Sequence, residues 1–189
     1  MIYNMNPEGL SAFLKALHFA AGKHRNQRRK DKRKTPYINH PIDVCYVLTE
    51  IGAVFDPTIL TAAILHDTVE DTSTRPEEVS ELFGSKVSAL VKEVTDDKRL
   101  PRFVRKKLQI EHAANLSDAA KQIKLADKIS NMRDLLENPP LYWNTRRKLE
   151  YIDWAEQVAN GLRNVNKMLE DAFDELVSAG KGKFGKKQL

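Results

Sequence analysis

Apolar side chains recur every three or four residues along most of the chain, a period that predicts amphipathic helices. No segment alternates as a strand does, and no repeat or βαβ rhythm occurs, so the predicted fold class is all-α. Residues 23–38 lack an apolar period and are predicted to form a loop, with a short extended piece at 35–38. The pattern predicts helices at about residues 8–22, 41–51, 57–67, 75–83, 85–94, 102–112, 118–136 and 145–179.

Residues that favour helix ends mark several of these boundaries. Pro41 suits a first helical position, and Gly52 is the expected C-terminal cap of the same helix. Asp56 is expected to cap the next helix at its N-terminus. The TRPE sequence at residues 74–77 has the form of a capping box, which would begin the fourth helix. Asn160-Gly161 is expected to break or bend the last helical region.

The helix that begins at residue 57 is apolar on nearly all sides, which predicts a position in the centre of the core. A chain of 189 residues is about the size of one domain and can bury a core without disulfides. We expect one compact domain over residues 1–178. Residues 179–189 are expected to form a basic, disordered tail.

Composition narrows the class of protein. A charged fraction of 30% and an apolar fraction of 41% are typical of a soluble globular protein. No apolar run approaches the ~20 residues of a membrane span, and the N-terminus lacks the regions of a signal peptide. The single cysteine, Cys45, excludes an intrachain disulfide and is consistent with a reducing compartment. We therefore expect a cytoplasmic protein with no membrane partner.

Positive charge is concentrated in a few segments. The net charge is +5, yet Lys23–Lys34 alone holds eight basic side chains and one acidic one. A second basic cluster lies at Lys98–Lys107, and a third lies in the tail. Few aromatic residues interleave with these charges, which favours phosphate binding over base stacking. Nucleic acid is therefore not the expected partner.

Candidate chemistry is concentrated at residues 65–72, LHDTVEDT, where the apolar helix gives way to acidic residues. His66 and Asp67 offer an imidazole and a carboxylate from adjacent positions, and both are ligands for divalent metals. Glu70 and Asp71 follow within about one helical turn. We interpret the first two residues as a metal-binding pair and the last two as an acid/base pair.

Two residues elsewhere could complete the metal site. His40 lies at the start of a helix, after a polar loop. Asp127 lies in the apolar stretch 123–129, where an unpaired carboxylate would be costly. Three separate helices could therefore bring ligands for Mn, Fe, Co or Zn to one point, and the lack of a cysteine ligand argues against structural zinc. The predicted ligands are His40, His66, Asp67 and Asp127.

Each of these signals has a simpler interpretation. A buried aspartate in a helix is more often paired with a lysine than with a metal, and Lys124 and Lys128 are close to Asp127 in sequence. His40 could belong only to a helix start. The order of the four residues, with a His-Asp pair ending an apolar helix, favours the metal site.

Three strings, TPYINHP at 35–41, LHDTVEDT at 65–72 and KLADKISNMRDL at 124–135, together resemble the HD-domain hydrolases of the RelA/SpoT type. The chain is most similar to the small alarmone hydrolases that include the metazoan SpoT homologue, from about Ala16 to Leu169. The resemblance implies an all-helical fold and a Mn²⁺-dependent hydrolysis with one ion per site. The implied substrate is guanosine 3′,5′-bis(diphosphate), (p)ppGpp, which loses its 3′-pyrophosphate. No synthetase region follows Leu169, so the resemblance implies degradation only.

The resemblance also implies residue roles. Its metal ligands fall on the four residues named above, and its catalytic acidic pair falls on Glu70 and Asp71. The implied substrate-binding residues are Arg29, Lys30, Asn131, Trp143, Arg147 and Tyr151. Two positions depart from the family pattern. Lys34 stands where the family usually has glycine, so the turn before Pro36 is expected to differ, and Asp134 stands where long members often carry threonine.

Two other functions stay open at the level of sequence. The same site could remove the 2′-phosphate of NADPH, an activity associated with small animal members, or act on another nucleotide. A non-enzymatic nucleotide- or RNA-binding helical domain would need only the basic clusters. The intact set of metal ligands and the acidic pair argue against this last function, because binding needs neither.

Overall fold

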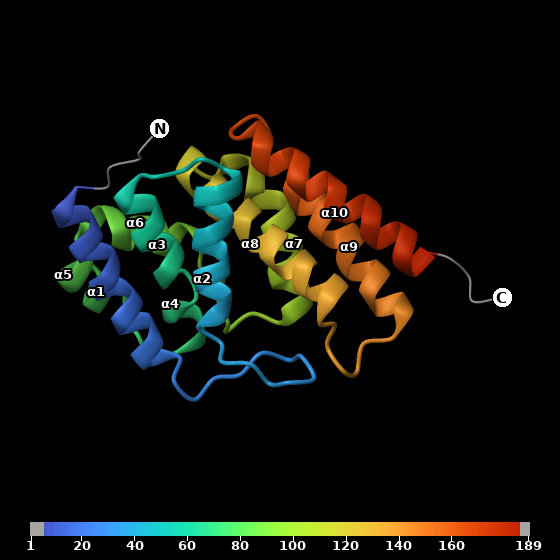
Figure 1. The fold of residues 1–189 in the computed structure, drawn as a ribbon, viewed down its shortest axis with the longest axis horizontal. Coiled ribbons are helices and arrows are strands. Elements are labelled where there is room, and N and C mark those ends of the chain that lie inside the picture. The colour runs from blue at the N-terminus through green and yellow to red at the C-terminus, as the bar shows by residue number, and fades with distance from the viewer. Residues whose placement is uncertain (1–5, 186–189) are drawn as a thin grey trace.

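The computed structural model describes residues 6–185, and helices packed side by side form an elongated molecule (Figure 1). Within this range the only pairing of extended backbone is an isolated antiparallel bridge between Arg28 and Pro36. The predicted all-α fold is therefore confirmed. Across the same residues, no helix is both long enough and apolar enough to span a bilayer.

The predicted helical regions are all helical, although some of their ends differ from the prediction. Two short segments, the π-helix η1 (Val47–Ile51) and the 3-10 helix η2 (Ala113–Asn115), continue α2 and α7. The α-helices are α1 (Pro7–Lys23), α2 (Asn39–Tyr46), α3 (Pro57–Leu65), α4 (Thr68–Asp71), α5 (Pro76–Phe83), α6 (Ser85–Val94), α7 (Arg102–His112), α8 (Asp118–Glu137), α9 (Thr145–Asn160) and α10 (Lys167–Gly185).

Helix α3 forms the centre of the N-terminal half, as its apolar sequence predicts. Every residue from Leu60 to Leu65 is buried, and α1, α2 and α6 pack around it. The predicted N-cap is confirmed, because Asp56 Oδ1 accepts hydrogen bonds from the backbone N–H groups of Thr58 and Ile59 at 2.7 and 3.2 Å. The buried C-terminal end of α3 thus delivers His66 to the interior.

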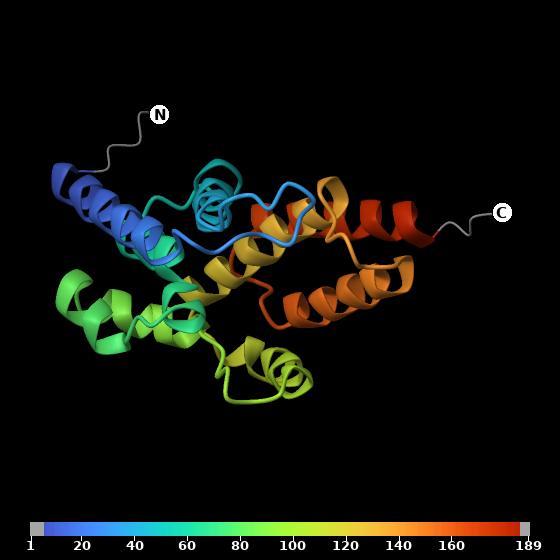
Figure 2. The ribbon, with the colours of Figure 1, turned by 90° about the horizontal axis from the view of Figure 1, so that it is seen from below.

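Helix α8 runs through the middle of the molecule and connects its two halves (Figures 1 and 2). It contacts α2, α3 and α6 on one side and α9 and α10 on the other. Ser117 caps its first turn by accepting a hydrogen bond from Ala120 N at 3.2 Å. The helix ends before Pro139 and Pro140, as predicted, since proline cannot continue the backbone hydrogen bonds. Residues on α8 can therefore reach both halves of the fold.

The predicted break at Asn160-Gly161 separates α9 from α10, and the two helices pack against each other (Figure 1). A Cβ atom at Gly161 would lie 2.6 Å from the Cβ atom of Ala113. Glycine therefore permits the close approach of η2 at this corner. Asn164 adopts a φ of 68° in the connection, a left-handed conformation that asparagine tolerates.

Three local predictions differ from the structure. The capping box at residues 74–77 does not form, because the N-cap of α5 is Arg75 and its side chain makes no capping bond. Thr74 instead exchanges a hydrogen bond of 2.8 Å with the Thr72 hydroxyl. Helix α2 begins at Asn39, before Pro41. Helix α10 continues to Gly185, so residues 179–185 are helical, and residues 186–189 of the expected tail lie outside the described part of the chain.

Candidate functional site

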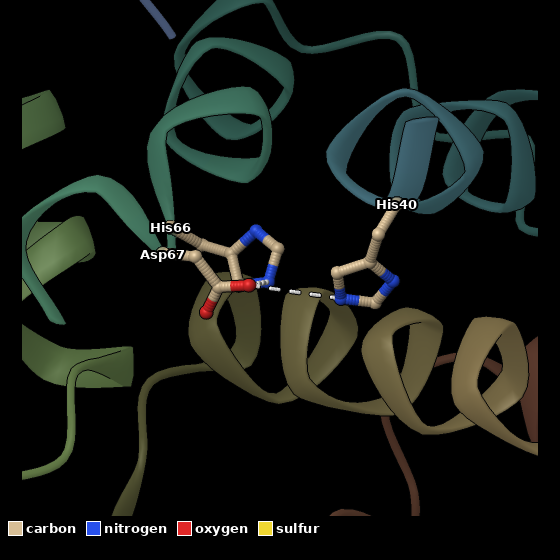
Figure 3. A group of neighbouring side chains, drawn as sticks. All are labelled: His40, His66 and Asp67. Atoms are coloured by element: carbon tan, nitrogen blue, oxygen red, sulfur yellow. Dashed lines mark ion pairs between the residues drawn. The ribbon is translucent and has the colours of Figure 1, made fainter. Parts of the chain in front are cut away.

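The four predicted metal ligands meet at one buried point. His40 Nε2 lies 3.1 Å from Asp127 Oδ1 and 3.7 Å from Asp67 Oδ2. His66 Nε2 lies 3.2 Å from Asp67 Oδ2 and 4.0 Å from Asp127 Oδ1. Figure 3 shows the two imidazoles pointing toward the Asp67 carboxylate, His40 from α2 and His66 from the end of α3. Asp127 comes from α8, so three helices converge as predicted.

Hydrogen bonds at the far side of each imidazole fix its orientation. His66 Nδ1 lies 2.7 Å from the carbonyl oxygen of Ala63, which can only accept, so Nδ1 carries the proton. His66 Nε2 is therefore the ring nitrogen left to face the carboxylates, and it is buried. His40 Nδ1 lies 3.0 Å from Ser130 Oγ, which likewise leaves Nε2 facing the carboxylates. Metal-binding histidines are oriented in this way.

The donor atoms fit a divalent cation. Ligand atoms of His40, His66 and Asp67 all lie within 4.8 Å of one another. Asp67 and Asp127 both face the two imidazoles, and two carboxylates beside one point repel each other unless positive charge lies between them. Burial lowers the pKa of His66, but the Asp67 carboxylate more than compensates and raises it to about 9. A proton thus supplies the charge that a metal ion could supply instead, and two imidazoles with two carboxylates suit a borderline-hard divalent metal.

Asp127 has a different partner for each oxygen. Its Oδ2 accepts a hydrogen bond from Lys128 Nζ at 2.8 Å, so the simpler interpretation of a lysine pair is also realised. Its Oδ1 faces His40 and accepts a hydrogen bond from Asn131 Nδ2 at 2.6 Å. Lys124 instead donates to the carbonyl oxygen of Val94 at 2.9 Å. Asn131, predicted to contact nucleotide, therefore also orients Asp127.

Tyr37 is a site residue that sequence reasoning missed. Its hydroxyl donates a hydrogen bond of 2.6 Å to Asp67 Oδ2. Burial and the charge of Asp67 raise the pKa of Tyr37 well above its usual range, so the phenol stays protonated and donates. Its place in the TPYINHP string, just before His40, was the available signal.

Glu70 lies on the single turn of α4, beside the cluster of ligands. Its Oε2 accepts a hydrogen bond from the backbone N–H of Asp96 at 3.1 Å, and Arg105 Nη1 lies 3.5 Å from Oε1. Burial raises the pKa of Glu70 to about 7, and the charges of Asp67 and Asp96 contribute to the shift. A carboxyl with a pKa near neutral can exchange a proton efficiently at cellular pH.

Asp71 is held from two sides. Its Oδ2 accepts a hydrogen bond from Gln27 Nε2 at 2.8 Å, and its Oδ1 forms an ion pair with Lys98. Gln27 belongs to the basic loop after α1, and Lys98 precedes α7. The two predicted acidic residues thus have distinct environments, one poised near neutral pH and one engaged with cationic and amide donors.

A cavity of about 770 Å³ lies beside the ligands, with Glu70 and Asp71 in its wall. Eight basic and five acidic side chains line it, so it favours anions. The basic residues are Arg28, Arg29, Lys30, Lys98, Arg102, Arg105, Lys106 and Lys128, and the aromatic residues are Tyr37, Trp143, Tyr151 and Trp154.

The predicted substrate-binding residues lie in different parts of the cavity wall or behind it. Lys30 lines the cavity with an exposed side chain, and so its charge is available. Trp143 and Tyr151 form an aromatic wall with ring centroids 5.6 Å apart. Trp154, which sequence reasoning missed, extends this wall at 5.4 Å from Tyr151. Arg147 does not line the cavity, and its guanidinium carbon lies 4.6 Å from the centre of the Trp143 ring.

Arg29 is in the cavity wall, but its guanidinium is already paired. Its Nε and Nη2 lie 3.1 and 2.5 Å from Asp134 Oδ2, and Nη2 also donates to Asn131 Oδ1 at 3.1 Å. Asp134 is the residue that departs from the threonine of long family members. The predicted phosphate-binding role of Arg29 is therefore shared with a structural one, which links the basic loop to α8.

Helix α7 supplies cations that were not assigned to the site from sequence. Arg102, Arg105 and Lys106 share one face of the helix and line the cavity. Lys106 Nζ lies 4.4 Å from the centre of the Trp154 ring, and Trp154 Nε1 donates to the Lys106 carbonyl at 3.1 Å. The signal in the sequence was the basic cluster at Lys98–Lys107, whose charges recur at helical spacing.

Comparison with known proteins gives consistent matches. A profile of the HD domain matches residues 16–152. A Homo sapiens protein named guanosine-3′,5′-bis(diphosphate) 3′-pyrophosphohydrolase MESH1 is 53% identical over 163 residues, which cover 86% of this chain and 91% of that protein. The Drosophila melanogaster protein of the same name is 50% identical over 164 residues, which cover 87% and 92% of the two chains.

The fold agrees with the sequence matches. A solved structure of a metazoan ortholog of SpoT, described as hydrolysing ppGpp and as playing a role in starvation responses, superposes with a TM-score of 0.87. It is 48% identical in sequence, and the match covers 89% of this chain and 95% of that one.

Proposed function

The chain belongs to the HD-domain family of hydrolases, and we propose that it hydrolyses guanosine 3′,5′-bis(diphosphate) and releases pyrophosphate from the 3′ position. The observation that supports this most directly is the convergence of the four proposed ligand side chains beside a cation-lined cavity that has Glu70 in its wall. The relatives named for this activity match over nearly their whole length, which supports the same substrate.

The proposal assigns a divalent metal ion, Mn²⁺, to His40, His66, Asp67 and Asp127. When bound, such an ion lowers the pKa of a water ligand and offsets charge on phosphoryl oxygens. The four side chains supply two neutral nitrogen donors and two carboxylates, whose charge matches that of one divalent ion. The hydrogen bonds from Tyr37 and Asn131 hold the two carboxylates in place.

Glu70 is the proposed proton acceptor. A water oxygen attacks the phosphorus that is bonded to the ribose 3′ oxygen, Glu70 takes the proton of that water, and the bond from phosphorus to the ribose oxygen breaks. The pKa of about 7 keeps a substantial fraction of Glu70 ionised at neutral pH. The products are the nucleoside 5′-diphosphate and pyrophosphate, with the ribose oxygen protonated.

The cavity supplies the remaining binding energy. We assign the phosphate groups to Lys30, Lys98, Arg102 and Arg105, and the nucleoside to the aromatic wall of Trp143 and Tyr151. Phosphoryl transfer depends mainly on positioning and on electrostatic stabilisation, which such cations provide.

Product identification tests the proposal. Purified protein is incubated with Mn²⁺ and either (p)ppGpp or NADPH, and pyrophosphate and orthophosphate are measured separately. The proposal expects pyrophosphate from (p)ppGpp. Orthophosphate from NADPH without alarmone turnover would assign the site to a 2′-phosphatase instead. The absence of any product from both nucleotides would contradict both substrate assignments.

A further inference from the structure

His24 is a buried residue in a loop whose Lys and Arg side chains are mostly exposed. Its side chain is only 1% accessible, whereas Arg25, Lys30 and Lys32 are exposed. The imidazole touches none of the four ligands of the proposed metal. It has instead two partners that themselves contact the site, Gln27 and Tyr37.

The Asp71 carboxylate determines the direction of the two hydrogen bonds that connect His24 to it through Gln27. An ionised carboxylate can only accept, so the group of Gln27 that lies 2.8 Å from Asp71 Oδ2 must be the NH₂ group. The amide oxygen then points to His24 Nδ1 at 2.7 Å and requires a proton there. His24 is thus fixed in the tautomer with hydrogen on Nδ1, and it determines which way the Gln27 amide points.

The His24 imidazole also packs against Tyr37, which contacts Asp67 of the site. The ring centroids of His24 and Tyr37 are 5.0 Å apart, and Tyr37 N donates to the Gln27 carbonyl at 3.1 Å. His24 Nε2 is buried without a hydrogen-bond partner, which is unfavourable for folding. Apolar side chains of similar size would fill this space without that cost, so packing alone does not account for a histidine here.

We propose that His24 is a positioning residue that orients the Asp71 carboxylate through Gln27. The role in turnover rests on the proposed hydrolase function, whereas the orienting contact stands on the hydrogen bonds alone. Without the Nδ1 donor, the Gln27 amide is free to rotate, and its oxygen can face Asp71 and repel it. The acidic pair would then lose the geometry that the reaction requires.

Two substitutions at His24 separate donation from packing. His24→Leu keeps the bulk and removes the donor, and we expect kcat to fall by about 10–100-fold with KM changed less than about threefold. His24→Asn keeps an N–H group near the position of Nδ1, and we expect kcat within about threefold of the wild type. The exposed His18 on α1 provides the control, since His18→Leu should leave both constants unchanged.

A substitution at Gln27 supplies a second readout. Gln27→Glu places a carboxylate against Asp71, and the repulsion raises the pKa of the pair. We expect the acid limb of the kcat profile to move to higher pH by about one unit or more. A purely structural role of the loop would lower the amount of folded protein without moving this limb.

Crystal structures separate failure of this inference from failure of the proposed function. We expect Gln27 Nε2 to lie beyond 3.5 Å from Asp71 in His24→Leu and within hydrogen-bond distance in His24→Asn. An unchanged Gln27–Asp71 bond in His24→Leu, or an unchanged kcat, would overturn the positioning role. A wild-type protein that releases no pyrophosphate would overturn the substrate assignment, and the crystallographic comparison would still decide the role of His24.

Discussion

His66 and Glu70 lie one helical turn apart in sequence, yet the site gives them different tasks. His66 turns its Nε2 atom toward two carboxylates, whereas Glu70 lies in the cavity wall beside Asp96 and Arg105. We expect His66→Ala to lose bound metal and turnover together, because one of four donors is missing. We expect Glu70→Gln to keep metal and lose rate by at least about 100-fold. Metal content by atomic emission and pyrophosphate release measure the two effects.

The control for this pair is Glu81→Gln, an exposed carboxylate on α5. It should leave metal content and rate unchanged. A Glu70→Gln protein that binds no metal would contradict the assignment of Glu70 as proton acceptor, and a His66→Ala protein with normal metal content would contradict the ligand set.

Glu70 also makes stability depend on pH. Its pKa is raised from 4.5 to about 7 in the folded protein, so the folded state binds more protons than the unfolded state between these values. Unfolding free energy therefore falls as pH rises through this window, by about 2–3 kcal/mol for this group. We expect metal-free Glu70→Gln to gain stability over the wild type at pH 8 but not at pH 4. Urea denaturation at both pH values measures the difference, and an equal gain at both would contradict the raised pKa.

Lys34 adopts a conformation that favours glycine. Its φ is 49°, in the left-handed region, and its side chain is exposed. This is the position where the family usually has glycine, and lysine here adopts a conformation that is strained for a residue with a Cβ atom. We expect Lys34→Gly to raise the unfolding free energy by about 0.5–1 kcal/mol. Lys32→Gly, in the same loop and without a positive φ, should lower it instead, and chemical denaturation compares the two.

At the residue scale, the convergence of the four proposed ligands was predictable and their supporting contacts were not. His40, His66 and Asp127 carry the signal of ionisable groups at the ends or inside of apolar helices, which is visible in a sequence. The partners of Arg29 could not be predicted from the sequence. Asp134 and Asn131 lie on α8, and only the packing of the basic loop against that helix brings them within reach.

At the scale of elements, the corner between α9 and α10 depends on one close contact. A Cβ at Gly161 would lie 2.6 Å from Ala113 Cβ and 2.8 Å from Ala114 N, so η2 would have to move. We expect Gly161→Ala to lower the unfolding free energy by about 1–3 kcal/mol. Gly182→Ala on α10 meets no atom within 4 Å and should be neutral or stabilising, because alanine favours the helix. Thermal unfolding distinguishes the two variants.

Periodicity predicted the longer helices but missed the single turn of α4, and the helix ends depended on side-chain contacts that periodicity does not report. Asp56 and Ser117 cap their helices through bonds to their own first turns, and these local contacts were predictable. The hydroxyl of Thr74 had two local options and took the Thr72 hydroxyl rather than the backbone of α5.

At the scale of the molecule, the ligand cluster joins both halves of the fold. His40 and His66 come from α2 and α3, and Asp127 comes from α8, which also packs on α9 and α10. A metal bound only by the folded state should therefore stabilise the whole domain, by about 2.7 kcal/mol at 100 times its Kd. We expect Mn²⁺ to raise the Tm by about 5–10 °C. His66→Ala should abolish this shift and His18→Ala should keep it, and an equal shift in both would indicate adventitious binding.

Helix α7 carries none of the four proposed metal ligands. It has no fully buried residue; Ile110 packs against the core, and hydrogen bonds and ring contacts join the helix to α9 and to the segment before it. Substitutions on such a surface change stability little. The same face nevertheless presents Arg102, Arg105 and Lys106 to the cavity. Substitutions confined to α7 can therefore change the charge that the cavity presents to a bound molecule, while the four proposed metal ligands and the helices that carry them stay as they are.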